Sequence, residues 1–219
     1  MIFFPACPEQ SFFSVCDAKN GYWQLKLDES SIDLTAMATP FGRYAWKRMP
    51  FGVSPAPEIF QEKLDQAIEG LEGVFAIFDD ILVIGEGDTL EEAESNHDVR
   101  FLGLMERSRE RKLQFHPDKL RFKLKGVPYV GHELTSCGLK IDEHKVKAIK
   151  EMQMPENVRE VRRFVGMANF FSRFMPNMAT ALQPLHQLTA KDAAWVWGPE
   201  HNDAVTAVKE ALSSAPVLK

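Results

Sequence analysis

The sequence predicts an α+β fold, with antiparallel strands and flanking helices in the first part of the chain and helices in the second. Three observations predict this. Short strand-like segments alternate with turn signals before residue 51. Two helical segments with polar caps or apolar stripes follow, separated by a strand-like stretch. After Gly138 the pattern becomes helical, and we place a boundary near residues 135–140.

The composition is typical of a globular chain of one large domain or two small ones. The 219 residues are 45% hydrophobic and 26% charged, and no run of 18 apolar residues predicts a spanning helix. The first ten residues lack the basic and long apolar regions of a signal peptide. The three cysteines are odd in number and widely spaced, which favours reduced thiols. We therefore expect an intracellular protein, in the cytoplasm or the nucleus, with no membrane partner.

Charge is distributed unevenly along the chain, although the net charge is only −5. Residues 86–98 carry six acids and no Lys or Arg, whereas residues 99–125 carry nine basic residues and three acids. Such a split can give an acidic protein a basic face that binds nucleic acid. It is equally typical of a solvated helix followed by a basic loop.

The N-terminal part begins with strand-like segments. The stretch "SFFSVC" predicts a strand, the pair Asn20-Gly21 predicts a turn, and alternation over residues 22–26 predicts a second strand. Between residues 35 and 51, turn signals separate further short strand-like pieces. These signals are Pro40, Gly42 and Pro50.

Residues 54–71 predict a helix that Ser54 caps and that Gly70 and Gly73 end. Its apolar stripe consists of Phe60, Leu64, Ile68 and Leu71. The next stretch, "GVFAIFDDILVIG", predicts a hairpin over residues 73–85 with its two acids near the bend.

Two further helices carry capping signals. Thr89 and Glu92 form a capping-box pattern at the start of a helix that runs to about Lys112. Asn157 and Glu160 form a second pair, and the stripe behind them consists of Val161, Phe164, Val165, Ala168, Phe171 and Met175. The segment "PYVGHELT" predicts a short strand or turn. Near the C-terminus, "WVWGPEHNDAVTAVKEAL" predicts a strand and then a helix that begins at Pro199.

The adjacent acids Asp79 and Asp80 are the first candidate for chemistry. Two neighbouring carboxylates repel each other in a partly desolvated site unless a cation is present. A bound divalent metal keeps both ionised, and paired magnesium ions are the usual agents of phosphoryl transfer. Solvent-exposed Asp-Asp turns are also common, so this pair alone leaves both interpretations open. Asp17, which follows a strand-like segment, is the candidate for a third carboxylate.

Five ordered motifs carry a resemblance to a known family. They are "FSVCDAKNGYWQLKLDE", "MPFGVSPAPEIFQ", "FDDILV", "HPDKLRF" and "YVGHELTSCGLKID". Together they closely resemble the reverse transcriptase of gypsy-type LTR retrotransposons, from about residue 12 to the C-terminus. The resemblance implies a polymerase palm with partial fingers (about 25–50) over residues 1–134, a helical thumb over 135–182, and the start of a connection segment over 183–219.

The resemblance implies an RNA-directed DNA polymerase. Asp17, Asp79 and Asp80 would hold two Mg²⁺ ions, with Mn²⁺ as a substitute, for nucleotidyl transfer templated by RNA or DNA. Lys119 would protonate the leaving pyrophosphate as a general acid. The partners implied are a template with a DNA primer, deoxynucleoside triphosphates, and the RNase H and integrase regions of a parent Pol polyprotein.

The same resemblance implies a nucleotide site. Tyr22 would exclude a ribose 2′-hydroxyl by its bulk, Phe51 would line the incoming nucleotide, and Gln61 would lie near the template and nucleotide. Each residue type has an ordinary alternative, because aromatic residues pack in cores and glutamine is common on exposed helices.

The segment "YVGHEL" resembles the primer grip, the hairpin that positions the primer end. Its contact residues would be Val130, Gly131 and His132. A single histidine of this kind is also a common structural hydrogen-bond donor, and its spacing gives no support to metal ligation.

The chain departs from the family pattern in several places. Pro55 replaces an Asn that often precedes Ala-Pro after "MPFG", which would alter the entry of the helix. Ile77 stands where the family carries a tyrosine before the paired acids, a position that supports the site without ligating metal. The fingers strands that grip the triphosphate are expected before residue 12, where "MIFFPACPEQ" stands instead. We therefore expect an N-terminally truncated fragment that is weakly active by itself. The alternatives are a non-catalytic retroelement relic that binds nucleic acid, and a metal-dependent nuclease.

Overall fold

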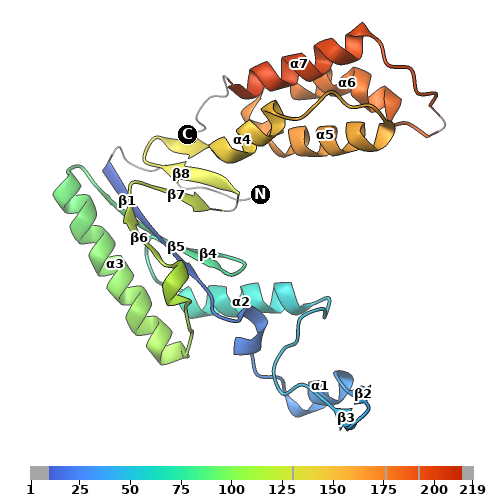
Figure 1. The fold of residues 1–219 in the computed structure, drawn as a ribbon. Coiled ribbons are helices and arrows are strands. Elements are labelled where there is room, and N and C mark those ends of the chain that lie inside the picture. Colours follow the sequence, from blue (N-terminus) through green and yellow to red (C-terminus); the bar gives the residue numbers. More distant parts are fainter. Residues whose placement is uncertain (1–9, 130, 176, 192, 214–219) are drawn as a thin grey trace. The chain divides into compact units, whose positions relative to one another are not determined.

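The computed structural model describes residues 10–129, 131–175, 177–191 and 193–213 (Figure 1). The chain divides into two compact units, whose described residues are 10–129 and 131–213. Within these ranges, every helix is too short or too polar to cross a lipid bilayer.

The first unit is built on a four-stranded antiparallel sheet (Figure 1). Its strands lie in the order β4 (Val74–Ile77), β5 (Asp80–Gly87), β1 (Gln10–Asp17) and β6 (Arg121–Leu124). β1 and β5 pair over their whole length. The four residues 81–84 of β5 are all buried, without the alternation of a half-exposed strand, which means that both faces of this strand are covered.

Two helices pack on the sheet, as the sequence predicts. α2 (Ala56–Ile68) contacts β4, and α3 (Leu90–Arg111) contacts β5 and β1. The shared core consists of Cys16, Ala18, Phe60, Leu64, Ile68, Val74, Ile81, Val83 and Leu104. This arrangement of an antiparallel sheet with flanking helices confirms the predicted α+β class.

The predicted helix signals are confirmed except at one cap. Thr89 and Glu92 form the full capping box of α3, and Lys112 ends that helix in the left-handed conformation. The predicted cap at Ser54 is wrong, because α2 begins after Pro55 and receives no side-chain hydrogen bond there. Proline in the first turn of α2 presets the helical φ and leaves fewer backbone donors to satisfy.

The segment after β1 differs from its prediction. Residues 22–26 do not form a strand, because Gly21–Gln24 is a 3₁₀ helix, η1. Asn20 and Gly21 both adopt positive φ, which turns the chain sharply. The Gln24 amide then fixes the turn by donating to the carbonyl oxygens of Lys19 and Gln114 at 2.7 and 2.9 Å.

Smaller elements complete this unit. β2 (Met37–Thr39) and β3 (Gly42–Tyr44) pair as the turn signals predict. α1 (Glu29–Leu34) was not predicted, although Asp28 caps it by accepting a hydrogen bond from the Ser31 amide at 2.7 Å. η2 (Pro117–Lys119) and β7 (Gly126–Tyr129) lie on either side of β6 in the sequence.

The second unit combines a short hairpin with helices. β8 (His132–Thr135) pairs with β9 (Gly138–Lys140). The helices that follow are α4 (Glu143–Lys150), α5 (Val158–Phe170), the 3₁₀ turn η3 (Ser172–Phe174), α6 (Met178–Leu188) and α7 (Pro199–Ser213).

The sequence signals of the second unit are largely confirmed. All six members of the α5 stripe are buried, and Asn157 caps that helix. α7 begins at Pro199 as predicted. The predicted strand before it is wrong, because residues 193–198 adopt no strand. Trp195 and Trp197 instead stack on each other with ring centroids 5.5 Å apart.

Candidate active site

Asp17 and Asp80 lie directly opposite each other on neighbouring strands. Asp17 is the last residue of β1, Asp80 is the first residue of β5, and the two are antiparallel pairing partners. Side chains at directly opposite positions project from the same face of the sheet, with Cβ atoms about 4.5–5.5 Å apart. The register therefore brings together two carboxylates that are far apart in the sequence.

Asp79 joins them through the β4–β5 turn. Ile77 pairs with Asp80, which leaves Phe78 and Asp79 as a two-residue hairpin loop. Phe78 has a φ of 54°, a conformation that hairpin turns of this length require and that a phenylalanine adopts only under strain. The Asp79 carbonyl oxygen accepts a hydrogen bond from the Ala18 amide at 2.7 Å, which ties the turn to the end of β1.

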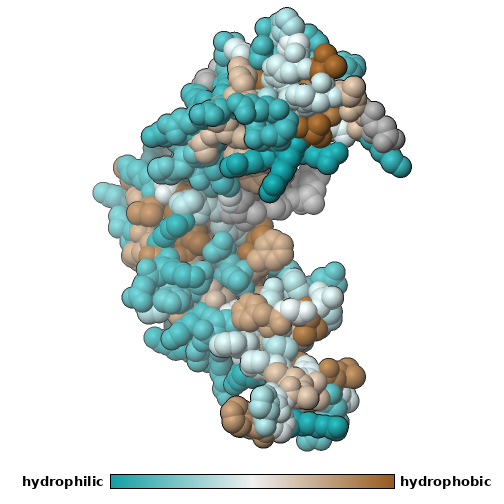
Figure 2. Space-filling view, turned by 45° about the vertical axis from the view of Figure 1, so that its right-hand side comes forward, coloured by the Kyte–Doolittle hydropathy of each residue, from teal (hydrophilic) through white to brown (hydrophobic). Residues whose placement is uncertain are grey.

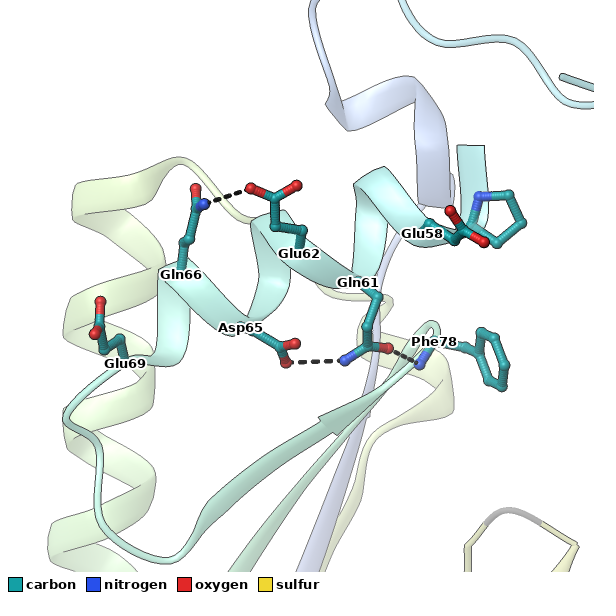
Figure 3. A pocket seen from close by; sticks show the side chains of 8 residues that line it. Glu58, Gln61, Glu62, Asp65, Gln66, Glu69 and Phe78 are labelled. Carbon is teal, nitrogen blue, oxygen red and sulfur yellow. Dashed lines mark hydrogen bonds between the residues drawn. The ribbon is translucent and has the colours of Figure 1, made fainter. Parts of the chain in front are cut away.

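Gln61 holds the strained turn from α2. Its side-chain oxygen accepts a hydrogen bond from the Phe78 amide at 2.7 Å. Its amide nitrogen donates to the Ala76 carbonyl oxygen and to an Asp65 carboxylate oxygen, both at 2.9 Å. Figure 3 shows Gln61 reaching from α2 to the turn, with Asp65 beside it on the same helix. The sequence reasoning placed Gln61 near the site but missed these hydrogen bonds.

The environment of Asp79 and Asp80 disfavours the ionised form of their carboxyl groups. Burial raises the pKa of Asp80, and the carboxylates of Asp17 and Asp79 raise it further. The pKa of Asp79 is also raised, first by burial and then by Asp17. Lys119 and Arg121 oppose these shifts only in part. The site thus attracts a cation.

Lys119 is the cation that the structure places there. Its Nζ atom donates to both carboxylate oxygens of Asp17, at 3.0 and 2.9 Å. Lys119 ends η2, and the amide of the neighbouring His116 donates to the Asp17 carbonyl oxygen at 2.9 Å. The loop before β6 is therefore fixed to the end of β1, with the lysine beside the carboxylates.

The donor set fits a hard divalent cation. Carboxylate oxygens are the ligands that Mg²⁺ prefers. Burial and the neighbouring carboxylates raise the pKa values of Asp79 and Asp80, which a bound cation would offset. Among the described residues, no three acid, His or Cys side chains are already grouped around one point as metal ligands. Both oxygens of Asp17 face Lys119 in this arrangement, so a metal would have to exchange with the lysine.

Tyr22 and Phe51 lie beside the carboxylates. A Cβ atom added to Gly21 would stand 3.3 Å from Asp79 Oδ1 and 3.7 Å from Phe51 Cζ, so the ring and the carboxylate both border this glycine. The Tyr22 ring packs between Phe51 and the buried Phe60, with centroid distances of 5.0 and 5.5 Å. Tyr22 is half-buried and Phe51 is exposed, which leaves the Phe51 ring available to a ligand.

The predicted primer-grip residues belong mainly to the second unit. Val130 lies outside the described residues. Gly131 adopts a φ of 78°, and its carbonyl oxygen accepts a hydrogen bond from Lys145 Nζ at 2.7 Å. His132 is buried and stacks on Phe170, with ring centroids 4.9 Å apart. His132 is therefore part of the packing between the β8–β9 hairpin and α5.

A second polar cluster has the composition of a hydrolytic triad without its accessibility. Ser14 Oγ lies 2.8 Å from His97 Nε2, and His97 Nδ1 lies 3.4 Å from Asp98. Ser14 and His97 are fully buried, and the Ser14 hydroxyl also accepts a hydrogen bond from the Lys123 amide at 2.9 Å. These contacts join α3, β1 and β6, so the cluster is structural.

Comparisons with known proteins show which family this chain resembles. The family model described as "Reverse transcriptase (RNA-dependent DNA polymerase)" matches residues 6–167. The Retrovirus-related Pol polyprotein from transposon 412 of Drosophila melanogaster is 31% identical over 95% of this chain and 16% of that protein. The corresponding polyprotein from transposon opus, from the same organism, is 32% identical over 81% of this chain and 17% of its own length.

This chain thus spans about a sixth of the length of these two curated relatives. Among solved structures, a foamy viral protease-reverse transcriptase in complex with an RNA/DNA hybrid superimposes with a TM-score of 0.81 at 23% identity. The match covers 97% of this chain and 28% of that one, and it shows a shared fold.

Proposed function

Because this chain belongs to the reverse transcriptase (RNA-dependent DNA polymerase) family, we propose that it carries the catalytic centre of an RNA-directed DNA polymerase from a gypsy-type retrotransposon. The reaction is the transfer of a deoxynucleotide to a primer 3′-hydroxyl, templated by RNA or DNA. One observation carries the proposal: the register that sets Asp17 opposite Asp80, with Asp79 in the adjoining turn.

The three aspartates hold the divalent ions of this reaction. When bound, two Mg²⁺ ions, or Mn²⁺ in their place, neutralise the phosphate charge and stabilise the attacking and leaving oxygens. Asp17 and Asp80 would be ligands from two paired strands, and Asp79 would add a third carboxylate from the turn. Gln61 keeps that turn in place through the Phe78 amide.

Lys119 supplies a proton and a positive charge. Its ammonium group lies at hydrogen-bonding distance from Asp17, at the edge of the site. In the reaction it leaves Asp17 and donates its proton to the leaving pyrophosphate. The contact with Asp17 keeps the lysine close to the site until then.

The aromatic pair beside Asp79 selects the nucleotide. Tyr22 packs against Phe60, and its ring excludes a ribose 2′-hydroxyl by bulk. Phe51 forms the exposed wall against which the incoming base and sugar lie. Gly131 and His132, with Val130, form the primer grip.

The proposed domain assignment follows the family. Residues 1–134 form the palm with partial fingers, 135–182 the thumb, and 183–219 the start of the connection segment. The proposed partners are a template with a DNA primer, deoxynucleoside triphosphates, and the RNase H and integrase regions of a parent polyprotein in an intracellular particle. The solved relative that holds an RNA/DNA hybrid supports a nucleic-acid partner.

Primer extension with Mg²⁺ tests the proposal. The chain by itself is expected to add deoxynucleotides only weakly to a DNA primer on RNA and DNA templates, and chelation of the metal should stop this addition. Asp17→Asn, Asp79→Asn and Asp80→Asn should each abolish extension, whereas Asp33→Asn, on the exposed helix α1, should not. Duplex cleavage without extension would instead indicate a nuclease. Duplex binding without either activity would indicate a non-catalytic relic.

A further inference from the structure

A row of aromatic rings leads away from the carboxylates on the surface of the first unit. Trp46 stacks on Trp23 with ring centroids 6.1 Å apart and planes inclined by 23°. Trp23 meets Phe51 edge-on at 5.9 Å, and Phe51 meets Tyr22 at 5.0 Å. Because Phe51 borders Gly21 beside Asp79, the row runs continuously from the candidate active site to Trp46.

The outer rings of this row are open to solvent. Trp23 is 43% exposed, Trp46 is 38% exposed and Phe51 is 59% exposed. Large exposed aromatic surfaces are uncommon unless they bind something. Figure 2 shows further hydrophobic side chains at the surface at its lower end, where α1, β2 and β3 lie. Tryptophan is close to neutral on the hydropathy scale of that figure and is not drawn brown.

The backbone around the row is fixed, so the rings form a preformed surface. The Leu27 amide donates to the Lys47 carbonyl oxygen at 3.1 Å, and the Met49 amide donates to the Leu25 carbonyl oxygen at 3.0 Å. Arg48 donates to the carbonyl oxygens of Trp23 and Gln24 at 3.0 and 3.1 Å. These contacts join the two segments that carry Trp23 and Trp46.

Positive charge accompanies the rings. Residues 41–52 carry Arg43, Lys47 and Arg48 and no acid. Lys26 pairs with Arg48 in an isolated antiparallel bridge, so a further exposed cation lies beside the row. By contrast, the hollow along α2 that Figure 3 shows is lined by Glu58, Glu62, Asp65 and Glu69, which repel a phosphate backbone.

We propose that Trp23 and Trp46 form a stacking platform for single-stranded nucleic acid, specifically the unpaired template that enters the active site. This proposal rests on the proposed polymerase function. Aromatic faces accept bases without regard to sequence, and neighbouring cations hold the backbone, which is the combination found in proteins that bind single strands. The incoming nucleotide lies on Phe51, and the template bases still to be copied lie on Trp23 and Trp46.

Binding measured without metal tests the platform independently of catalysis. Fluorescence anisotropy in EDTA compares three labelled DNA probes: oligo(dT), a blunt hairpin, and the same hairpin with a 5′ overhang. Trp23→Ala and Trp46→Ala are each expected to weaken binding of oligo(dT) and of the overhang hairpin by roughly tenfold. Binding of the blunt hairpin should not change. Trp23→Phe, which keeps a ring, should retain most of the affinity.

Trp195→Ala is the matched control. Trp195 is also 38% exposed and also stacks on a tryptophan, but it belongs to the second unit. Its replacement should leave all three affinities unchanged. Circular dichroism and thermal melting of each variant show whether the fold is intact, and Lys47→Ala provides a variant that removes charge without removing a ring.

Several results would overturn the platform. One is that native protein and both alanine variants bind the overhang hairpin equally well. Another is that the alanine variants lose as much affinity for the blunt hairpin as for the overhang hairpin. A third is that the variants change the oligomeric state, which would assign the aromatic patch to self-association. Failure of the polymerase proposal is separate, because Asp80→Asn should lose extension and keep overhang binding. Overhang binding that depends on Trp23 in a chain that never extends a primer would leave the platform standing.

Discussion

Asp17 at the end of β1 and Asp80 at the start of β5 are pairing partners in an antiparallel sheet, and their carboxylates share one face of it. One residue further along, the Ala18 amide donates a hydrogen bond to the Asp79 carbonyl oxygen, which continues the pairing of the two segments. The site is therefore a property of the strand pairing. Replacement of one of these aspartates by asparagine should leave the fold intact. Replacement of a residue that holds the turn or the strand ends should displace the carboxylates.

The first prediction concerns the stability cost of the carboxylates. The pKa of Asp80 is raised in the folded protein, so the folded state binds more protons than the unfolded state above pH 3.8 and loses stability as pH rises through the raised value. Asp80→Asn should therefore raise the melting temperature at neutral pH while abolishing extension.

Calorimetry in EDTA at pH 7, with Asp33→Asn as the exposed control, measures this effect. The control should melt like the native protein. A lower melting temperature for Asp80→Asn than for the native chain would show that the ionised carboxylate stabilises the fold and would contradict the electrostatics described above.

The second prediction concerns the clamp on the turn. Gln61→Leu removes the hydrogen bonds to the Phe78 amide and the Ala76 carbonyl oxygen and should lower the free energy of unfolding by about 1–2 kcal/mol. Because Asp79 then loses its fixed position, kcat should fall by roughly ten- to a hundredfold with little change in KM.

Gln66→Leu is the control for Gln61, since Gln66 lies on the same helix and bonds only to exposed side chains. Steady-state kinetics and urea unfolding of both variants make the comparison. If Gln66→Leu lowered kcat as much as Gln61→Leu, the clamp would have no special role.

The third prediction uses the close approach at Gly21. This residue has a φ of +45°, and a Cβ atom there would stand 3.3 Å from Asp79 Oδ1. Gly21→Ala should cost about 1–2 kcal/mol of stability from backbone strain and should also reduce extension by displacing the carboxylate.

Gly166→Ala is the control, because Gly166 lies in α5 with open space around it. This change should instead stabilise the protein by up to about 1 kcal/mol. Chemical denaturation measures the free energy of unfolding of both variants. An unchanged free energy of unfolding for Gly21→Ala would contradict the close approach of Gly21 to Asp79.

The fourth prediction concerns His97. Burial lowers its pKa below 6.5, so the unfolded state takes up a proton first as pH falls. The stability that depends on neutral His97 is present above pH 6.5 and should be lost progressively as pH falls below that value.

Urea unfolding at a series of pH values measures this loss. His97→Gln should flatten the dependence, whereas His144→Gln, at an exposed position in α4, should keep it. An unchanged slope in His97→Gln would place the pH dependence elsewhere.

The sequence was sufficient for elements whose signals are local. The capping box at Thr89, the stripe of α5 and the hairpin at residues 73–85 depend on residues within a turn or two of each other, and the structure confirms all three. The predicted strand at Trp195–Trp197 failed because alternation also fits an extended segment that has no pairing partner. The predicted strand over residues 22–26 was wrong because the 3₁₀ helix found there is fixed by a hydrogen bond to Gln114, which is distant in the sequence.

For the candidate site too, the sequence was sufficient for local features and insufficient for contacts between distant residues. Spacing alone could not set Asp17 opposite Asp80, because strand register is decided by the burial of whole faces. The resemblance to the reverse transcriptase family supplied only the expectation that the three aspartates form one site. The same limit explains why the contact of Gln61 with the Phe78 amide and the orientation of Lys119 toward Asp17 were not foreseen. The roles of Tyr22, Phe51, Lys119 and the primer-grip residues stay predictions.

Metal binding by the native chain and by Asp17→Asn tests the central claim most directly. Electron paramagnetic resonance with Mn²⁺ reports bound metal without requiring polymerase activity, and Asp33→Asn serves as the control. The three-carboxylate site predicts that native protein and Asp33→Asn bind Mn²⁺ and that Asp17→Asn binds it at least roughly tenfold more weakly. Equal Mn²⁺ binding by Asp17→Asn and the native chain would contradict it.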